Sequence, residues 1–306
     1  MNRIAVQTGG PEERYGIDKT YQKVKEWGFD AVDVNLDHLL PGKDIIAGNI
    51  PEVLVRGGTE CMELFRPWGE ASKHFGIDNY QAHAPFPSLV HPLDSETNQR
   101  MVAVLQNTLC GCNEINCRNL IIHPFFLGYD HRLVPDDEWN INLEYYSRLI
   151  PVAKEYGVTI CLENMFTRHD GKIYAACCSD IGEATRYIDE LNRLAGSRVF
   201  GFCLDTGHML LCGLDPFDTV TRLGDRICAF HLHDNNGWDD QHLAPYMGIL
   251  DWNRFCDGVR KIGYDKTLSF ETFNVWNRMD PSVSDEMMRY IAACGRCFAK
   301  KISEGE

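Results

Sequence analysis

The chain has 306 residues, of which 44% are hydrophobic and 24% charged, a composition typical of a globular protein and unlike that of a disordered one. Its net charge of -14 repels phosphate backbones and anionic lipid headgroups, so we expect neither a nucleic-acid partner nor a membrane surface as partner. No run of 18 apolar residues and no secretory leader is visible, and the thirteen cysteines are scattered as buried free thiols would be, so we expect a cytoplasmic protein.

Short apolar, β-prone stretches alternate along the chain with longer stretches of helical spacing. The predicted strands are residues 4–8, 31–36, 80–85, 119–125, 159–165, 200–206, 227–234 and 267–273. Residues 145–156 and 179–195 illustrate the helices between them, the second opening on Ser179-Asp180 as an N-cap. Eight strands that alternate with helices predict an α/β fold, the (β/α)8 TIM barrel, as one domain over residues 1–306.

The longest connections follow the C-terminal ends of predicted strands. They are the predicted loops 37–51, 127–140, 166–178 and 235–250. Barrel enzymes build their active sites from loops at this end, so we expect the functional site there.

Ionisable residues stand at the far end of six of these apolar strands. They are His83, His123, Glu163, Asp205, the pair His231 and His233, and Glu271. A buried charge without a partner costs several kcal/mol. Because all six strands have such a residue at the same end, a partner that they share at the barrel mouth is the simplest explanation. A divalent cation (Mn, Zn, Mg or Co) would meet this need, with Glu163, Asp205, His231 and Glu271 as its ligands.

The chain resembles the sugar isomerase and epimerase superfamily of xylose isomerase-like barrels, which also includes the apurinic endonucleases. The matching motifs are His83-Ala84-Pro85-Phe86, His123-Pro124, Leu162-Glu163-Asn164, Asp205-Thr206-Gly207-His208, His231-Leu232-His233-Asp234-Asn235, Asp240-Gln241-His242 and Phe270-Glu271. The resemblance implies that Glu163, Asp205, His231 and Glu271 ligate one metal ion, with Glu163 and Glu271 also acting as acid and base. It further implies that His208 contacts a substrate oxygen, and we expect His83, His123 and His233 to line the substrate site.

The resemblance also leaves a second metal site open. In the nuclease branch, further ions occupy positions whose counterparts here are His83, His123, His208, Asp240 and His242. One feature departs from the ketose 3-epimerases: their substrate-binding arginine would fall near Asn236 or Gly237, and neither position is an arginine.

These residues together predict a metal-dependent isomerase or epimerase that acts on a sugar or sugar derivative by proton transfer through an enediolate. A lyase or dehydratase of the same barrel type, acting on a keto-sugar or a dehydroshikimate-like compound, is the first alternative. A multi-metal phosphoester hydrolase is the second, and a non-catalytic sugar-binding protein the third. No Walker loop or GxGxxG turn follows a strand, so we expect no nucleotide cofactor. Barrel enzymes often oligomerise, and a homo-oligomer is therefore an allowed assembly.

Overall fold

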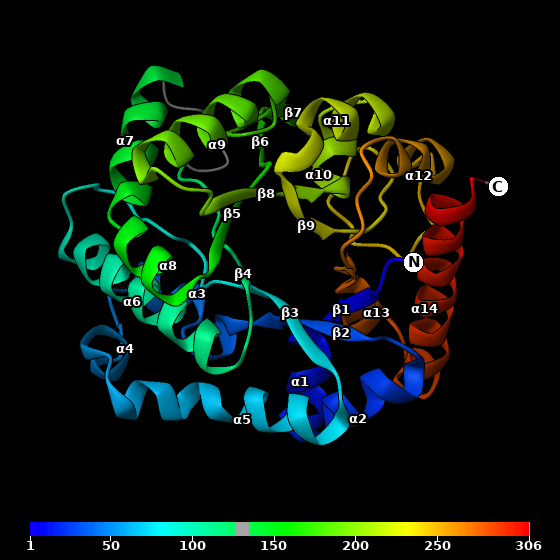
Figure 1. Cartoon of the computed structure of the whole chain (residues 1–306), viewed down its shortest axis with the longest axis horizontal. Helices are drawn as coiled ribbons and strands as arrows, with labels where there is room; N and C mark the ends of the chain where they lie inside the picture. Colours follow the sequence, from blue (N-terminus) through cyan, green and yellow to red (C-terminus); the bar gives the residue numbers. More distant parts are fainter. Residues whose placement is uncertain (127–134, 306) are drawn as a thin grey trace.

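The structure is a computed structural model that describes residues 1–126 and 135–305. Within these residues, eight parallel strands lie side by side in the order β10-β1-β2-β3-β4-β5-β8-β9 (Figure 1). They are β1 (Ile4–Gln7), β2 (Ala31–Asn35), β3 (Asp78–His83), β4 (Asn119–Ile121), β5 (Thr159–Glu163), β8 (Phe200–Asp205), β9 (Ile227–His231) and β10 (Leu268–Phe270).

The two edge strands, β9 and β10, meet just beyond the end of β9. There the Leu232 N–H donates to the Ser269 carbonyl at 2.8 Å, and the Glu271 N–H donates to the Leu232 carbonyl at 3.1 Å. These bonds bring the sheet to a nearly closed barrel. The predicted (β/α)8 barrel is confirmed, and each predicted strand overlaps an observed one.

Helices surround the strands on all sides (Figure 1). They are α1 (Gly9–Tyr15), α2 (Ile17–Trp27), η1 (Leu36–His38), α3 (Gly42–Ile46), α4 (Glu52–Arg56), α5 (Thr59–Phe75), α6 (Glu96–Glu114), α7 (Pro135–Ser147), α8 (Ile150–Tyr156), α9 (Ile181–Ala195), α10 (Thr206–Leu211), α11 (Pro216–Leu223), η2 (Gly224–Arg226), α12 (Trp252–Lys261), α13 (Asn274–Arg278) and α14 (Pro281–Glu304). Every residue of β1, β2, β8 and β9 is buried, because helices cover one face of each strand and the barrel interior the other. All thirteen cysteines are free thiols in the structure.

The predicted helix 145–156 is two helices in the structure. Helix α7 ends at Ser147 and α8 begins at Ile150, with Pro151 in its first turn. Proline lacks the N–H that a continuous helix would need at this position, so the chain restarts the helix there. Helix α9 begins one residue after Asp180, whose side chain accepts the Glu183 N–H at 2.8 Å as the expected N-cap.

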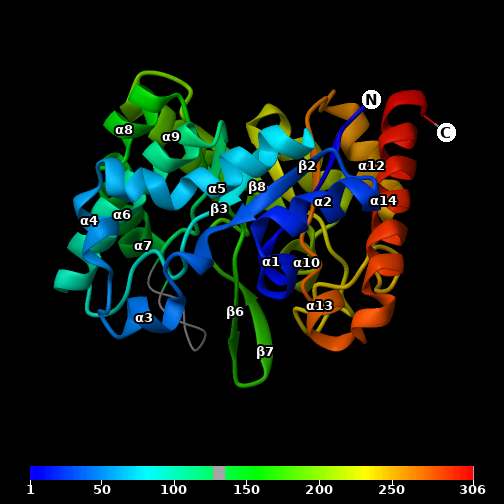
Figure 2. The ribbon, with the colours of Figure 1, turned by 90° about the horizontal axis from the view of Figure 1, so that it is seen from below.

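The predicted loop 166–178 is in fact mostly a β-hairpin. Strands β6 (Phe166–His169) and β7 (Lys172–Ala175) pair antiparallel around Asp170 and Gly171, which both have positive φ, 49° and 73°. Asp-Gly is a preferred sequence for a two-residue turn of this kind, so the hairpin does have a signal in the sequence. Figure 2 shows the hairpin projecting from the barrel on the side where α3 and α13 lie.

The other long connections differ in how much secondary structure they contain. The connection after β2 contains η1 and α3, and residues 235–250 contain no helix or named strand. Of the predicted loop 127–140, residues 127–134 lie outside the described part of the chain, and α7 begins at Pro135.

Candidate metal centre and active site

The C-terminal ends of the strands surround a cavity of about 190 Å³. Among the described residues, its wall combines four histidines, four carboxylates, three phenylalanines, Gln7 and Met165. Glu163 and Glu271 belong to this wall. Asp205 and His231 lie behind it with no exposed surface. Three of these four end their strands β5, β8 and β9, and Glu271 follows directly after β10, so parallel strand ends bring them to one place.

His231 stands between the two glutamates. Its Nδ1 lies 3.2 Å from Glu163 Oε1 and 3.6 Å from Glu271 Oε2, and its Nε2 lies 3.0 Å from Asp33 Oδ2. An ionised carboxylate can only accept, so the Asp33 contact takes the ring hydrogen on Nε2. Nδ1 has no hydrogen-bond partner among the described residues. It faces the two glutamates and is available to bind a ligand.

Asp205 is held by two histidines. As the N-cap of α10, its Oδ1 accepts the backbone N–H of His208 at 2.6 Å, and the His233 ring approaches both of its oxygens. The His208 ring then lies between two carboxylates, with Nδ1 3.7 Å from Asp205 Oδ1 and 3.6 Å from Glu163 Oε1. The structure therefore gathers Glu163, Asp205, His231 and Glu271 into one buried group.

This group fits a divalent cation. Three carboxylates packed out of water repel one another, and a cation among them removes that repulsion. The free Nδ1 of His231 supplies the nitrogen donor that such a site needs, oriented by the Asp33 contact behind it. Oxygen donors with one imidazole suit Mn, Mg, Co or Zn, although they do not distinguish among these metals.

The two glutamates have pKa values displaced in opposite directions. Burial alone would raise the pKa of Glu163, but the adjacent His231 and His123 rings hold it well below its usual range. Burial raises the pKa of Glu271 to about 7, against the opposing effect of His231 and His242. Two carboxyls with separated pKa values can serve as a base and an acid in the same site.

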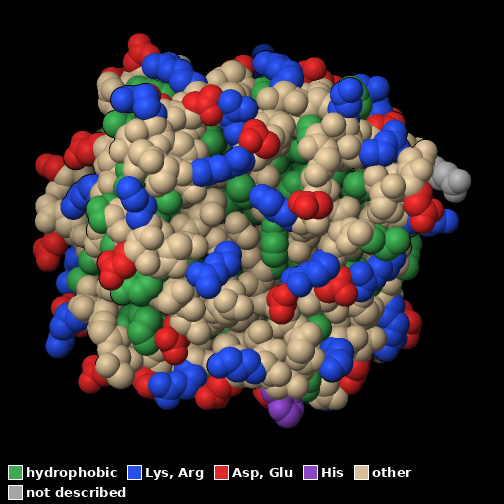
Figure 3. Space-filling model, viewed as in Figure 1, with side chains coloured by type: hydrophobic (Ala, Val, Ile, Leu, Met, Phe, Trp, Pro, Cys, Tyr) green, Lys and Arg blue, Asp and Glu red, His purple; other side chains and the backbone are tan. Residues whose placement is uncertain are grey.

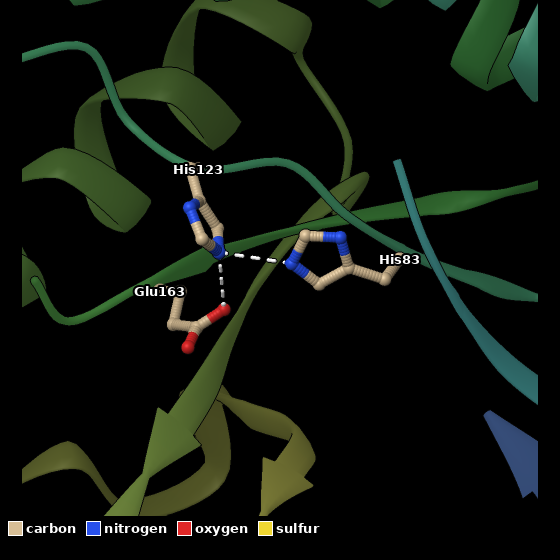
Figure 4. Close-up of side chains that lie close together, drawn as sticks. All are labelled: His83, His123 and Glu163. Carbon is tan, nitrogen blue, oxygen red and sulfur yellow. Dashed lines mark hydrogen bonds and ion pairs between the residues drawn. The ribbon is translucent and has the colours of Figure 1, made fainter. Parts of the chain in front are cut away.

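A second group of donors lies beside Glu163. Nε2 of His123 is 2.9 Å from Nε2 of His83 and 3.0 Å from Glu163 Oε2, so three donor atoms converge from β3, the segment after β4, and β5 (Figure 4). The single hydrogen that Nε2 of His123 can carry cannot be donated to both His83 and Glu163. Because three donor atoms converge here, the same group could bind a small cation.

A third group is built by the loop after β9. Asp240 Oδ2 lies 2.9 Å from His242 Nε2 and 3.5 Å from His208 Nε2. Burial would raise the pKa of Asp240, but the two histidines hold it below its usual range. Burial would lower the pKa of His242, but Asp240 and Glu271 raise it to about 9. All five residues expected at a second metal therefore lie at the cavity, in two separate groups on either side of Glu163.

His233 differs from the other expected substrate contacts. His83, His123 and His208 form part of the cavity wall, whereas His233 has no exposed surface and does not line the cavity. Its ring turns toward Asp205 instead.

Two buried polar residues of the site are not among those expected from the sequence. Asp33, in β2, is fully buried and contacts His231, and Gln7, at the end of β1, donates from Nε2 to Glu271 Oε1 at 2.9 Å. The available signal is a polar residue in each of two largely apolar strands, IAVQ and AVDVN. It is weaker than a charged residue at a strand end, because it does not indicate which distant residue it meets.

The β6–β7 hairpin is tied to the loop after β9. The Arg168 guanidinium donates to the Trp238 carbonyl at 2.5 Å and lies 3.3 Å from Asp239 Oδ1. This loop contains Asn236 and Gly237, the positions near which the ketose 3-epimerases have their substrate-binding arginine. The hairpin therefore brings an arginine, Arg168, to a region where the loop itself has none.

The surface and the helices give two further observations. On the face seen in Figure 3, Lys and Arg side chains alternate with Asp and Glu, without a block of one sign. Within the described residues, none of the helices has the length and apolar composition needed to span a bilayer.

The chain matches known proteins at the level of family, sequence and structure. The family model described as "xylose isomerase-like TIM barrel" matches residues 21–294. An uncharacterised protein of Methanocaldococcus jannaschii, MJ1311, is 27% identical over 225 residues, 72% of each chain. D-psicose 3-epimerase of Enterocloster bolteae is 28% identical over 151 residues, and inosose dehydratase of Lacticaseibacillus casei is 26% identical over 147. These alignments cover 46% and 42% of this chain, and less than half of each enzyme, 46% and 45%.

Solved structures agree on the fold. A D-tagatose 3-epimerase-like protein superposes with a TM-score of 0.72 at 19% identity over 99% of both chains. The IOLI protein, solved with a bound zinc atom, superposes with a TM-score of 0.68 at 13% identity, over 98% of this chain and 97% of that one. At these identities the likeness concerns the fold alone.

Proposed function

Because this chain belongs to the xylose isomerase-like TIM barrel family, we propose that it is a divalent-metal-dependent isomerase or epimerase of a sugar or sugar derivative. The observation that carries the proposal is the arrangement of Glu163 and Glu271. They come from strands separated around the barrel, share the wall of one cavity, and both approach Nδ1 of His231, at 3.2 and 3.6 Å. Relatives named as a sugar epimerase and an inosose dehydratase support a carbohydrate-like substrate.

Glu163, Asp205, His231 and Glu271 would hold the metal. When bound, a divalent cation supplies positive charge beside adjacent hydroxyl and carbonyl oxygens of the substrate, which acidifies the neighbouring C–H and stabilises the enediolate. The native ion would be Mn, Zn, Mg or Co.

The two glutamates would move the proton. One of the two, Glu163 or Glu271, would remove the proton from carbon, and the other would return one from its own side of the cavity. In the reverse reaction the roles exchange. The face that receives the proton decides between the two epimers.

The other cavity residues would orient the substrate. His208, His83 and His123 form part of the wall and would contact substrate oxygens. Phe86, Phe166 and Phe273 supply the apolar part of that wall, against which the C–H face of a sugar ring can pack.

The test is exchange of a carbon-bound proton with solvent. The metal-loaded protein is incubated in D2O with a panel of ketohexoses and keto-glycosides, and loss of the proton signal is followed by NMR. We expect exchange by the unchanged protein, and less than about a hundredth of that rate for E163Q and for E271Q, consistent with the usual contribution of general acid–base groups. Metal content is measured in each variant. Exchange at an undiminished rate in either metal-containing variant would contradict the assigned role.

Two other results would indicate another reaction. A product that is lighter than its substrate by one water would indicate a dehydratase, for which the similarity to inosose dehydratase is the specific support. Two or three metal ions per chain together with phosphate release from esters would indicate a hydrolase, for which the additional donor groups around His123 and Asp240 are the support.

A further inference from the structure

His233 is buried directly behind the candidate metal ligand Asp205. It is the second residue after β9, has no exposed surface, and its Nε2 lies 3.1 Å from Asp205 Oδ1 and 2.9 Å from Oδ2. An ionised carboxylate accepts only, so the ring hydrogen that makes this contact is on Nε2. The other ring nitrogen, Nδ1, has no hydrogen-bond partner among the described residues. The polar contact of this ring is therefore made to Asp205.

The side chain of Thr206 holds the backbone of His233 through two hydrogen bonds. The Thr206 Oγ1 donates to the His233 carbonyl at 2.8 Å and accepts the His233 N–H at 3.0 Å. The neighbouring Gly207 leaves room for the ring, because a Cβ built there would lie 1.9 Å from His233 Cε1. Thr206 and Gly207, the two residues directly after Asp205, thus both accommodate His233.

A second ring fixes the tilt of the imidazole. The rings of His233 and His242 are stacked, with centroids 4.0 Å apart and planes 10° from parallel. His242 adopts a left-handed backbone, φ 45°, which costs a non-glycine residue about 1 kcal/mol. Its own ring is anchored through Nε2 to Asp240 at 2.9 Å. The His233 plane is therefore determined independently of Asp205.

We propose that His233 is a positioning residue, which sets the orientation of the Asp205 carboxylate for a bound divalent cation. A carboxylate rotates freely about its terminal bond unless its oxygens are held. Here the His208 N–H and the His233 ring hold them. The inference rests on the proposed metal site and adds to it a residue that does not itself contact the ion or the substrate.

Two substitutions separate the hydrogen bond from the packing. H233Q keeps a donor where Nε2 stands and loses the aromatic ring, whereas H233F keeps a ring to stack on His242 and loses the donor. As a control, W252F removes a different buried hydrogen bond, from Trp252 Nε1 to Asp234 Oδ2 at 3.1 Å, in a residue whose ring contacts among the described residues are Tyr246, Phe255 and Phe298. Cobalt(II) alone is the probe, titrated against a competing chelator and followed by its visible absorption. The melting temperature of each metal-free variant is recorded separately.

Loss of an oriented contact behind a ligand lowers metal affinity by about 10- to 100-fold. We expect a loss of this size for H233F, and affinity within about threefold of the unchanged protein for H233Q and W252F, even where metal-free melting temperatures fall. If H233F binds cobalt as tightly as the unchanged protein, or H233Q loses as much affinity as H233F, the positioning role is wrong. If H233F does not fold, H233N replaces it, since its amide is too short to reach Asp205. Failure of the unchanged protein to bind cobalt would instead overturn the metal site of the proposed function, and the role of His233 with it.

Discussion

The imidazole of His231 and the carboxylate of Asp33 form a fully buried pair, with Nε2 3.0 Å from Oδ2, although 198 residues separate them in the chain. Asp33 also accepts a hydrogen bond from Gln81 Nε2 at 2.8 Å, so its own orientation is fixed. This pair decides which nitrogen of His231 faces Glu163 and Glu271. The arrangement resembles the carboxylate–histidine pairs that orient ligands in metal sites generally.

Replacement of Asp33 with Asn should weaken metal binding without removing a ligand. An amide can turn its NH2 group toward His231, which would favour the ring hydrogen on Nδ1 and block that nitrogen. We expect cobalt affinity to fall about 10- to 100-fold, measured by chelator competition. D78N, at the exposed partner of Arg3, is the control and should change affinity little. Equal affinities in D33N and the unchanged protein would mean that Asp33 does not orient the ligand.

Bound metal should stabilise the fold. An ion at 100 times its dissociation constant adds about 2.7 kcal/mol to the free energy of unfolding when it binds only the folded state. Urea unfolding with cobalt and with chelator measures the difference. D205N, which removes one of the proposed ligand carboxylates, should gain clearly less from the same cobalt concentration. An identical gain in D205N would place the stabilising ion elsewhere.

The stability of the fold should decline between about pH 4.5 and 7 because of Glu12, in α1. Burial raises the pKa of this side chain to about 7, although Trp68 donates to it at 2.8 Å. The folded state therefore keeps a proton that the unfolded state has released in this interval, so stability is lost as pH rises through it and is level above. E12Q should be more stable than the unchanged protein at pH 8, by up to about 3 kcal/mol, and nearly equal to it at pH 5.

Urea unfolding at the two pH values, in chelator, tests this expectation. E13Q, at the exposed neighbouring position of the same helix, is the control. A constant difference between E12Q and the unchanged protein at both pH values would argue against titration of Glu12.

Two Gly→Ala substitutions should have opposite effects. G207A adds a carbon 1.9 Å from His233 Cε1, which forces the ring or the backbone to move, at a cost of about 1–3 kcal/mol or more. G69A, inside α5, adds a carbon whose nearest neighbour is 3.6 Å away, and should stabilise the helix by about 0.5–1 kcal/mol. Thermal and urea unfolding compare them. G207A should also lose cobalt affinity; unchanged affinity would show that His233 can move without disturbing Asp205.

Much of the fold can be predicted from the sequence because most strands are short apolar stretches that end at a polar residue. The same pattern locates Glu163, Asp205 and His231, since an ionisable residue at the C-terminal end of a buried parallel strand lies at the mouth of the barrel. The assignment of these residues to a metal stays a prediction. The β6–β7 hairpin escapes this pattern, because its strands, Phe166-Thr-Arg-His169 and Lys172-Ile-Tyr-Ala175, are not apolar stretches. The partner of Asp33 is out of reach, because a register of strands around a closed barrel is needed to bring β2 opposite β9.

His233 shows a different limit of prediction from the sequence. Alternation along β9 suggests that it faces the same way as His231, toward the substrate. The strand ends at His231, however, and the hydroxyl of Thr206 forms hydrogen bonds with the backbone of His233. Alternation applies only while the strand continues.

The pairing of β1 with β10 also governs when the site can exist during synthesis. Gln7 leaves the ribosome early, whereas Glu271, whose carboxylate it contacts, is added 264 residues later. At roughly 5–20 residues per second, the first strand waits on the order of tens of seconds for its neighbour. A nascent chain that has passed His231 but not Glu271 has three of the four proposed ligands, so the full ligand set exists only after Glu271 has been added.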